Sequence, residues 1–239
     1  MRRSIAVQLA GESKQDWRRS SLGIVEAVDV AIVGGHGKIA LRLLALLAQR
    51  GDRARGVIRN PDHAPDLERR GAEAVICDIE REELTEAVNG AEAVVFAAGA
   101  GAGSGPERKR TVDLGGAVKL IEAAKANGVS RYLMVSAIGA NRPERWSEQM
   151  RPYYEAKSQA DAAVERSGLD FTIVRPGMLT DDPGSGLVEI AERIERSGSI
   201  ARDDVAAVLV ELLGTENAAG LSFDLLEGQT PVAEAVAAL

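Results

Sequence analysis

The stretch AIVGGHGKIALRLLALLAQRG, residues 31–51, decides the fold. An apolar run is followed by Gly34, Gly35 and Gly37, and then by a helix with periodic apolar residues. The spacing of Gly34, Gly37 and Ala40 is typical of a dinucleotide-binding turn. In such a turn the first glycine allows the tight bend, the second lets a pyrophosphate approach the backbone, and the small third residue lets the helix pack on the strand. The N–H groups at the helix start then bind the phosphates.

Apolar runs alternate with helical periods from residue 28 onward. The expected strands span residues 28–33, 53–59, 72–78, 91–99, 131–139, 170–177 and 221–226, and the expected helices span 38–50, 62–70, 81–89, 107–127, 152–167, 187–197 and 203–213. Because strands alternate with helices, we expect an α/β fold: a Rossmann-type, doubly wound parallel sheet, covered on both faces, with a small C-terminal lobe.

No linker divides residues 28–239, so we interpret them as a single domain that includes the C-terminal substrate lobe. Residues 1–27 are polar, mildly basic and without a sustained period, which indicates a flexible extension. A short amphipathic helix over residues 16–25 and an arm that contacts another subunit are the alternatives for this segment.

The composition narrows the classes of partner and site. The net charge of −7 argues against nucleic acid as a partner, because binding phosphates requires clustered lysine and arginine. One cysteine excludes an internal disulfide, and two histidines argue against a metal site. No apolar stretch has the length of a membrane span or a secretory signal, so we expect a cytoplasmic protein without a membrane partner. An aromatic content of 3% predicts an aliphatic core.

Residues at the strand ends predict the cofactor. Arg59 stands where NAD-binding proteins place a carboxylate for the ribose 2′-OH, and a guanidinium pairs instead with a 2′-phosphate, so NADP (NADPH) is favoured over NAD. Asp78 either meets the adenine edge or caps the next helix. The candidate cofactor-binding residues from this half of the chain are Gly34, Gly35, His36, Gly37, Lys38, Ile39, Arg59, Asp78, Ile79, Ala97, Ala98 and Gly99.

Two of these candidates are unusual in a phosphate-binding turn. His36 either reaches a phosphate or faces solvent. Lys38 lies at a helix start, where the helix dipole disfavours a cation, and a bound polyphosphate would relieve that conflict.

Ser136, Tyr153 and Lys157 form the candidate reaction centre. Ser136 lies at the end of the fifth expected strand, and Tyr153 and Lys157 lie four residues apart on the next helix, so they share one face. A lysine ammonium beside a phenol lowers the pKa of the phenol and also holds a nicotinamide ribose, so Lys157 is a candidate cofactor contact as well. Ser136 is a further candidate cofactor contact. The phenol then exchanges a proton with a carbonyl or alcohol oxygen. Tyr154 is the alternative proton donor, should the helix begin in a shifted register.

Seven stretches resemble a known family: VGGHGKIA, VIRNP, CDIE, VSAIGA, YYEAKSQAD, LDFTIVRPG and IARDDVA, which together span about residues 28–226. With them the chain resembles the short-chain dehydrogenases/reductases, and most closely their atypical group with NAD(P)-binding, NmrA-like and biliverdin-reductase-B-like members. The resemblance implies a Rossmann fold, a nicotinamide cofactor, and contacts from Pro176 and Gly177 to that cofactor. The GGHG turn departs from GATG, which is commoner in this family.

Together these residues predict an NADP(H)-dependent oxidoreductase that transfers hydride to or from a small carbonyl or alcohol substrate. An NmrA-like redox sensor that binds NADP(H) without turnover is the alternative, favoured by the lack of a long C-terminal substrate domain. A sugar epimerase or dehydratase ranks below both, because the C-terminal part is short for holding a nucleotide sugar. Related folds often pair through helices, so a homodimer is the assembly to test for.

Overall fold

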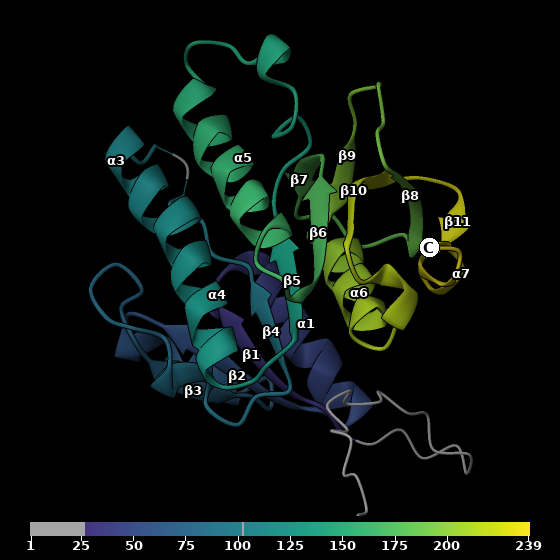
Figure 1. Ribbon diagram of the computed structural model, residues 1–239. Helices are drawn as coiled ribbons and strands as arrows, with labels where there is room; N and C mark the ends of the chain where they lie inside the picture. Colours follow the sequence, from purple (N-terminus) through teal and green to yellow (C-terminus); the bar gives the residue numbers. More distant parts are fainter. Residues whose placement is uncertain (1–26, 102) are drawn as a thin grey trace, which may run out of the picture.

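The computed structural model describes residues 27–101 and 103–239 (Figure 1). The predicted extension, residues 1–27, lies outside this range apart from its last residue. The main sheet has nine strands in the spatial order β11-β8-β10-β6-β5-β4-β1-β2-β3. This order, with helices between the strands, confirms the expected Rossmann-type, doubly wound α/β fold.

The parallel part of the sheet contains seven strands, and every strand expected from the sequence is among them. They are β3 (Glu73–Ile76), β2 (Arg53–Ile58), β1 (Asp29–Val33), β4 (Ala93–Phe96), β5 (Arg131–Val135), β6 (Asp170–Pro176) and β10 (Leu221–Glu227). The strands β8 (Leu187–Ala191) and β11 (Thr230–Pro231) continue it in antiparallel fashion, and β7 (Met178–Thr180) and β9 (Ser199–Ala201) form a separate pair. The winding reverses between β1 and β4, which is where ligands bind in open α/β sheets.

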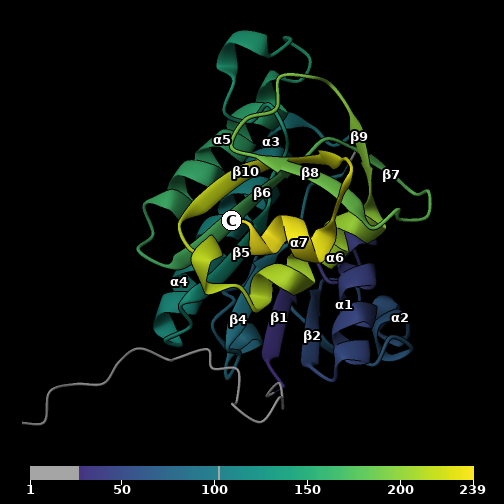
Figure 2. The ribbon, with the colours of Figure 1, turned by 90° about the vertical axis from the view of Figure 1, so that its right-hand side faces the viewer.

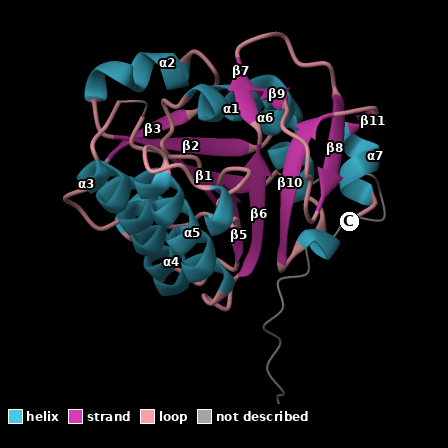
Figure 3. Cartoon of the chain, turned by 90° about the horizontal axis from the view of Figure 1, so that it is seen from above, coloured by secondary structure: helices cyan, strands magenta, loops and turns pink. Residues whose placement is uncertain are grey.

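Helices cover both faces of the sheet (Figures 2 and 3). One face carries α1 (Lys38–Arg50), α2 (Ala64–Glu68), α6 (Arg202–Leu213) and α7 (Val232–Ala237), and the other carries α3 (Pro106–Arg108), α4 (Gly116–Ala126) and α5 (Arg151–Glu165). A π-helical stretch, Lys109–Gly115, joins α3 to α4. Successive side chains of β1 enter two separate apolar cores, because Val30 and Ile32 face α1 whereas Ala31 and Val33 face α4.

Two of the expected helices are wrong. Residues 187–191 form β8 instead, because they pair with β10 and β11, and this pairing overrides the helical spacing of the apolar residues. Over residues 81–89 only a 3₁₀ turn forms, at Glu86–Val88. The other five expected helices are present, and α7 was not expected. Among the described residues, no helix combines the length and apolar character needed to cross a bilayer.

Candidate cofactor site and reaction centre

The turn after β1 requires glycine for reasons of space. Gly34 has a φ of +85°, and a Cβ atom there would lie 2.7 Å from the backbone of Ala98, which follows β4. A Cβ atom on Gly35 would lie 2.6 Å from the Cα atom of Gly56 in β2. The turn is therefore held between the two strands that flank β1, and a side chain at either position would push one of them away.

The start of α1 has the features of a phosphate site. Gly37 is the N-cap residue, its N–H donates to Gly34 O at 2.7 Å, and no side chain in the described part of the chain caps the helix. The first turn of α1 contains no acidic residue. Its N–H groups have no acceptors within the helix, and the helix dipole adds positive charge to them. An anion such as a phosphate fits these groups.

A cleft of about 280 Å³ opens at the carboxyl ends of β1, β2, β3 and β4. Nine of the predicted cofactor-binding residues line it: Gly34, His36, Gly37, Arg59, Asp78, Ile79, Ala97, Ala98 and Gly99. Gly35, Lys38 and Ile39 belong to the same turn and helix start without lining the cleft. The structure thus brings the first half of the predicted site together, and the roles of these residues in cofactor binding stay predictions.

Both unusual residues of the turn pair with carboxylates. His36 Nε2 lies 2.7 Å from Asp66 Oδ2, and the His36 ring stacks on that of His63 at 3.7 Å. Lys38 Nζ lies 2.5 Å from Asp181 Oδ2, in the segment after β7. The hydrogen bonds from His36 and Lys38 lower the pKa of the Asp66 and Asp181 carboxyls, respectively. His36 and Lys38 therefore have partners within the protein, and phosphate contact by either side chain stays a prediction.

Arg59 faces a second arginine across a carboxylate. Glu80 Oε2 lies 3.3 Å from Arg59 Nη1 and 3.0 Å from Arg108 Nη2, and Glu80 Oε1 accepts a hydrogen bond from Thr111 Oγ1 at 2.7 Å. The Thr111 hydrogen bond and the two guanidinium groups lower the pKa of the Glu80 carboxyl. Glu80 and Arg108 also line the cleft. Neither was predicted, because residues 80 and 108 lie far apart in the sequence and meet only through the fold.

Lys157 has a partner that the sequence analysis missed. Its ammonium lies 3.1 Å from Asp113 Oδ1 and donates to Val135 O at 3.2 Å, and the side chains of both charged residues are at least 95% buried. Asp113 comes from the π-helical stretch, and its Oδ2 accepts the backbone N–H of Ala100 at 3.1 Å. The signal available in the sequence was a carboxylate between two apolar residues, Val112 and Leu114, in the expected helix 107–127.

The expected effect of Lys157 on Tyr153 is wrong. Burial raises the pKa of the Tyr153 phenol above its ordinary value, and the Asp113 carboxylate adds to the rise. The positive charge of Lys157 is balanced by Asp113, so it does not favour the phenolate. Tyr153 is therefore a neutral hydrogen-bond donor over the physiological pH range.

Tyr153 and Tyr154 have different surroundings, which bears on the choice between them. The Tyr153 ring lies beneath Lys109 Nζ, 5.2 Å from the ring centre. Tyr154 stacks on Trp146, with 5.9 Å between ring centres, in the loop before α5. Tyr154 therefore packs against this loop, whereas Tyr153 lies against Lys109, and the choice of Tyr153 as the proton donor stays a prediction.

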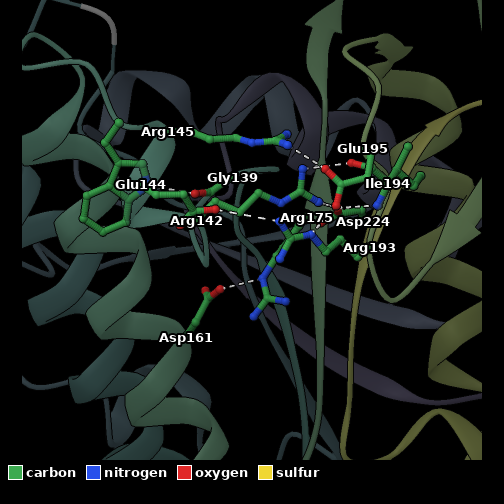
Figure 4. Close-up of polar contacts among 11 residues, drawn as sticks. Gly139, Arg142, Glu144, Arg145, Asp161, Arg175, Arg193, Ile194, Glu195 and Asp224 are labelled. Carbon is green, nitrogen blue, oxygen red and sulfur yellow. Dashed lines mark hydrogen bonds and ion pairs between the residues drawn. The ribbon is translucent and has the colours of Figure 1, made fainter.

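Ser136 lies near a buried ion pair that joins α5 to β6. Arg175 Nε lies 2.8 Å from Asp161 Oδ2, as Figure 4 shows. Burial raises the pKa of the Asp161 carboxyl, and the Arg175 guanidinium and the nearby Ser136 hydroxyl oppose this rise. In the same view Arg142 pairs with Asp224, which attaches the loop after β5 to β10. These two ion pairs attach α5 to β6 and the loop after β5 to β10.

Pro176 and Gly177 lie at the end of β6. Pro176 O accepts the backbone N–H of Ile138 at 2.9 Å. A Cβ atom on Gly177 would overlap the Leu226 side chain and lie 2.6 Å from Gly198 O. Packing against Leu226 of β10 and against the residue before β9 therefore already requires a glycine here. Contact of this pair with a cofactor stays a prediction.

Comparisons with known proteins agree with this geometry. The chain is 43% identical over 210 residues to YhfK of Bacillus subtilis, an uncharacterized sugar epimerase by name, with 87% of this chain and 98% of that protein covered. A solved structure from Bacillus halodurans, provisionally named an NAD-dependent epimerase/dehydratase, is 37% identical with a TM-score of 0.86, over 89% of this chain and 100% of that one. ChuY, an anaerobillin reductase from Escherichia coli O157:H7, is 25% identical with a TM-score of 0.72, over 83% and 97%.

A glycine turn at the switch point, an uncapped helix start and a cleft over four parallel strands define a Rossmann-fold protein with a site suited to a dinucleotide. The family model of NAD(P)H-binding proteins matches residues 34–216. The chain belongs to this family. Its similarity to epimerase/dehydratase-like and reductase structures confirms the resemblance to the atypical short-chain dehydrogenases/reductases, and the fold is that of NAD(P)-binding oxidoreductases.

Proposed function

We propose that the chain is an NADP(H)-dependent oxidoreductase that transfers hydride to or from a small carbonyl or alcohol substrate. The observation that carries the proposal is the pairing of an uncapped helix start with two arginines in one cleft. The helix start suits a pyrophosphate, and Arg59 and Arg108 suit the 2′-phosphate that distinguishes NADP from NAD. When bound, the nicotinamide supplies or accepts the hydride.

The residues of the reaction centre hold and move the proton that accompanies this hydride. Tyr153 stays protonated because its pKa is raised, so its hydroxyl is suited to donate a hydrogen bond, and then its proton, to a carbonyl oxygen. This role favours the direction of carbonyl reduction. Ser136 orients the same oxygen. Lys157 is held against Val135 O by Asp113, so it serves as a fixed donor for a ribose hydroxyl rather than as a tuner of the phenol.

The first experiment is a thermal-shift titration of the full chain with NADPH, NADP, NADH and NAD. A ligand that binds the folded state stabilises it by RT ln(1 + [L]/Kd), so the order of the shifts gives the order of affinities. We expect NADPH and NADP to give larger shifts than NADH and NAD. If none of the four shifted the unfolding temperature, the proposal would be wrong.

The second experiment separates the catalytic role of Tyr153 from binding. A panel of small aldehydes, ketones and quinones is tested with NADPH by the loss of absorbance at 340 nm. Tyr153→Phe should lower turnover of any accepted substrate by about a hundredfold or more with little change in nucleotide affinity. Tyr154→Phe is the matched control and should retain most of the turnover. Equal losses in both variants would contradict the assignment.

Sugar epimerase or dehydratase chemistry is the second candidate, because the names of YhfK and of the Bacillus halodurans structure refer to it. Such a reaction oxidises and re-reduces one substrate, so it changes no absorbance at 340 nm and consumes no nucleotide. Conversion of a nucleotide sugar without net use of NADPH would favour this candidate. Nucleotide binding with no conversion of any substrate would favour a redox sensor.

A further inference from the structure

The Glu80 side chain occupies the part of the cleft that faces both arginines. Its Oε2 atom is shared between Arg59 and Arg108, at 3.3 Å and 3.0 Å, and its Oε1 atom accepts from Thr111. The arginine side chains are 59% and 45% exposed, whereas that of Glu80 is 21% exposed. The carboxylate is thus the inner group and the guanidinium groups are the outer ones.

The backbone also fixes Glu80 in this place. The Glu80 N–H donates to Asp78 Oδ1 at 3.0 Å. The Asp78 N–H in turn donates to Glu82 Oε2 at 2.6 Å, which fixes the backbone of Asp78. Asp78 lines the same cleft. The segment after β3 is therefore a defined turn that presents the Glu80 carboxylate, and not a loose end.

The two guanidinium groups at this end of the cleft are only partly neutralised by the Glu80 carboxylate. Two guanidinium groups and one carboxylate give a local charge of about +1, whereas a 2′-phosphate carries close to two negative charges at neutral pH. A phosphate that binds the arginines must come close to the Glu80 carboxylate and is repelled by it. A ribose 2′-OH is neutral and donates a hydrogen bond, which a carboxylate accepts.

We propose that Glu80 is a specificity-determining residue. Its carboxylate keeps Arg59 and Arg108 together and reduces the factor by which the site prefers a nucleotide with a 2′-phosphate to one without it. The inference rests on the proposed use of this cleft for a nicotinamide dinucleotide. The inference predicts that the protein binds NADPH more tightly than NADH by only a modest factor. The reason is that the Glu80 carboxylate repels the 2′-phosphate that the two arginines attract. Removing the negative charge of Glu80 then increases this factor.

The test is a fluorescence titration of the full chain with NADPH and with NADH at two salt concentrations. Glu80→Gln keeps the size of the side chain and removes its charge. We expect it to tighten NADPH binding about fivefold to tenfold and to leave NADH binding unchanged or weakened, with a steeper dependence of NADPH affinity on salt. Glu122→Gln, an exposed change of the same charge on α4, is the control and should leave both affinities unchanged.

A second variant tests the contribution of an arginine to NADPH binding. Arg108→Met should weaken NADPH binding about tenfold and leave NADH binding within about twofold of the wild type. Circular dichroism of each variant checks that the fold is retained.

The outcomes separate the inference from the proposed function. If wild type binds neither nucleotide, the proposed function fails and the inference fails with it. If wild type binds and Glu80→Gln leaves the ratio of the two affinities within twofold, the inference is overturned while the proposed function stands. An equal change in the ratio for Glu122→Gln would assign the effect to net charge and would also overturn the inference.

Discussion

Replacing Asp113 with alanine should destabilise the protein strongly, because it leaves the Lys157 ammonium buried without its counter-charge. The two charged groups are 3.1 Å apart. At that separation their Coulomb attraction is about 5 kcal/mol at an effective dielectric constant of about 20. Removing one partner of such a buried pair costs about 3–5 kcal/mol, because the other charge keeps its desolvation penalty. We therefore expect Asp113→Ala to lower the free energy of unfolding by at least about 3 kcal/mol.

The measurement is urea denaturation followed by circular dichroism, with the midpoint and slope fitted for each variant. Asp113→Leu combined with Lys157→Met removes both charges and should recover most of the loss, since an apolar pair of similar volume substitutes well for a buried ion pair. Glu195→Ala breaks the exposed ion pair with Arg145 and serves as the matched control, with no measurable loss of stability expected. A loss of less than about 1 kcal/mol in Asp113→Ala would refute the reasoning.

Three further predictions concern the glycine turn and two tyrosines whose pKa is raised by burial, Tyr132 of β5 and Tyr153 of α5. Gly34→Ala should lower the free energy of unfolding by about 2 kcal/mol or more in urea denaturation, because the residue has a positive φ and its Cβ atom would meet the backbone of Ala98. Burial raises the pKa of both Tyr132 and Tyr153, so in the native protein neither should contribute tyrosinate absorbance at 295 nm below about pH 11, and Tyr153→Phe should leave that titration unchanged. Above about pH 10 the unfolded chain releases protons that the folded chain retains on these two phenols, so stability to urea should fall as pH rises; a constant stability between pH 9 and 11 would contradict this.

Much of the fold can be predicted from the sequence because its main signals are local. Each parallel strand is an apolar run bounded by turn residues, and the helices between most of them have clear apolar spacing. The helix expected over residues 187–197 is wrong, because the strand β8 forms there only through pairing with β10 and β11, which come later in the chain. The helix expected over residues 81–89 does not form, because the connection that contains it runs from β3 to β4 past two intervening strands. Extended backbone covers about 3.3 Å per residue and a helix only about 1.5 Å, so this long crossing favours turns over a helix.

The candidate site divides in the same way. The glycine turn and the strand ends that line the cleft are local features, and the fold collects them at one edge because parallel strands all end there. The groups that set the charge of the site are not local. Asp113 of the π-helical stretch meets Lys157 of α5, and Glu80 after β3 meets Arg108 of α3, so neither pairing has a sequence spacing that would predict it.

These missed pairings change the chemistry expected of the predicted residues. A lysine four residues after a tyrosine predicts a phenol with a lowered pKa only when no carboxylate pairs with the ammonium. In this protein Asp113 pairs with the Lys157 ammonium. An arginine after the second strand predicts a strong preference for a 2′-phosphate only when no carboxylate shares the guanidinium, and Glu80 shares it. In both cases the residue type indicated the location of the site, whereas a buried or half-buried acid from a distant segment determines its charge. Variants of these two acids therefore test the mechanism more directly than further variants of the motif residues.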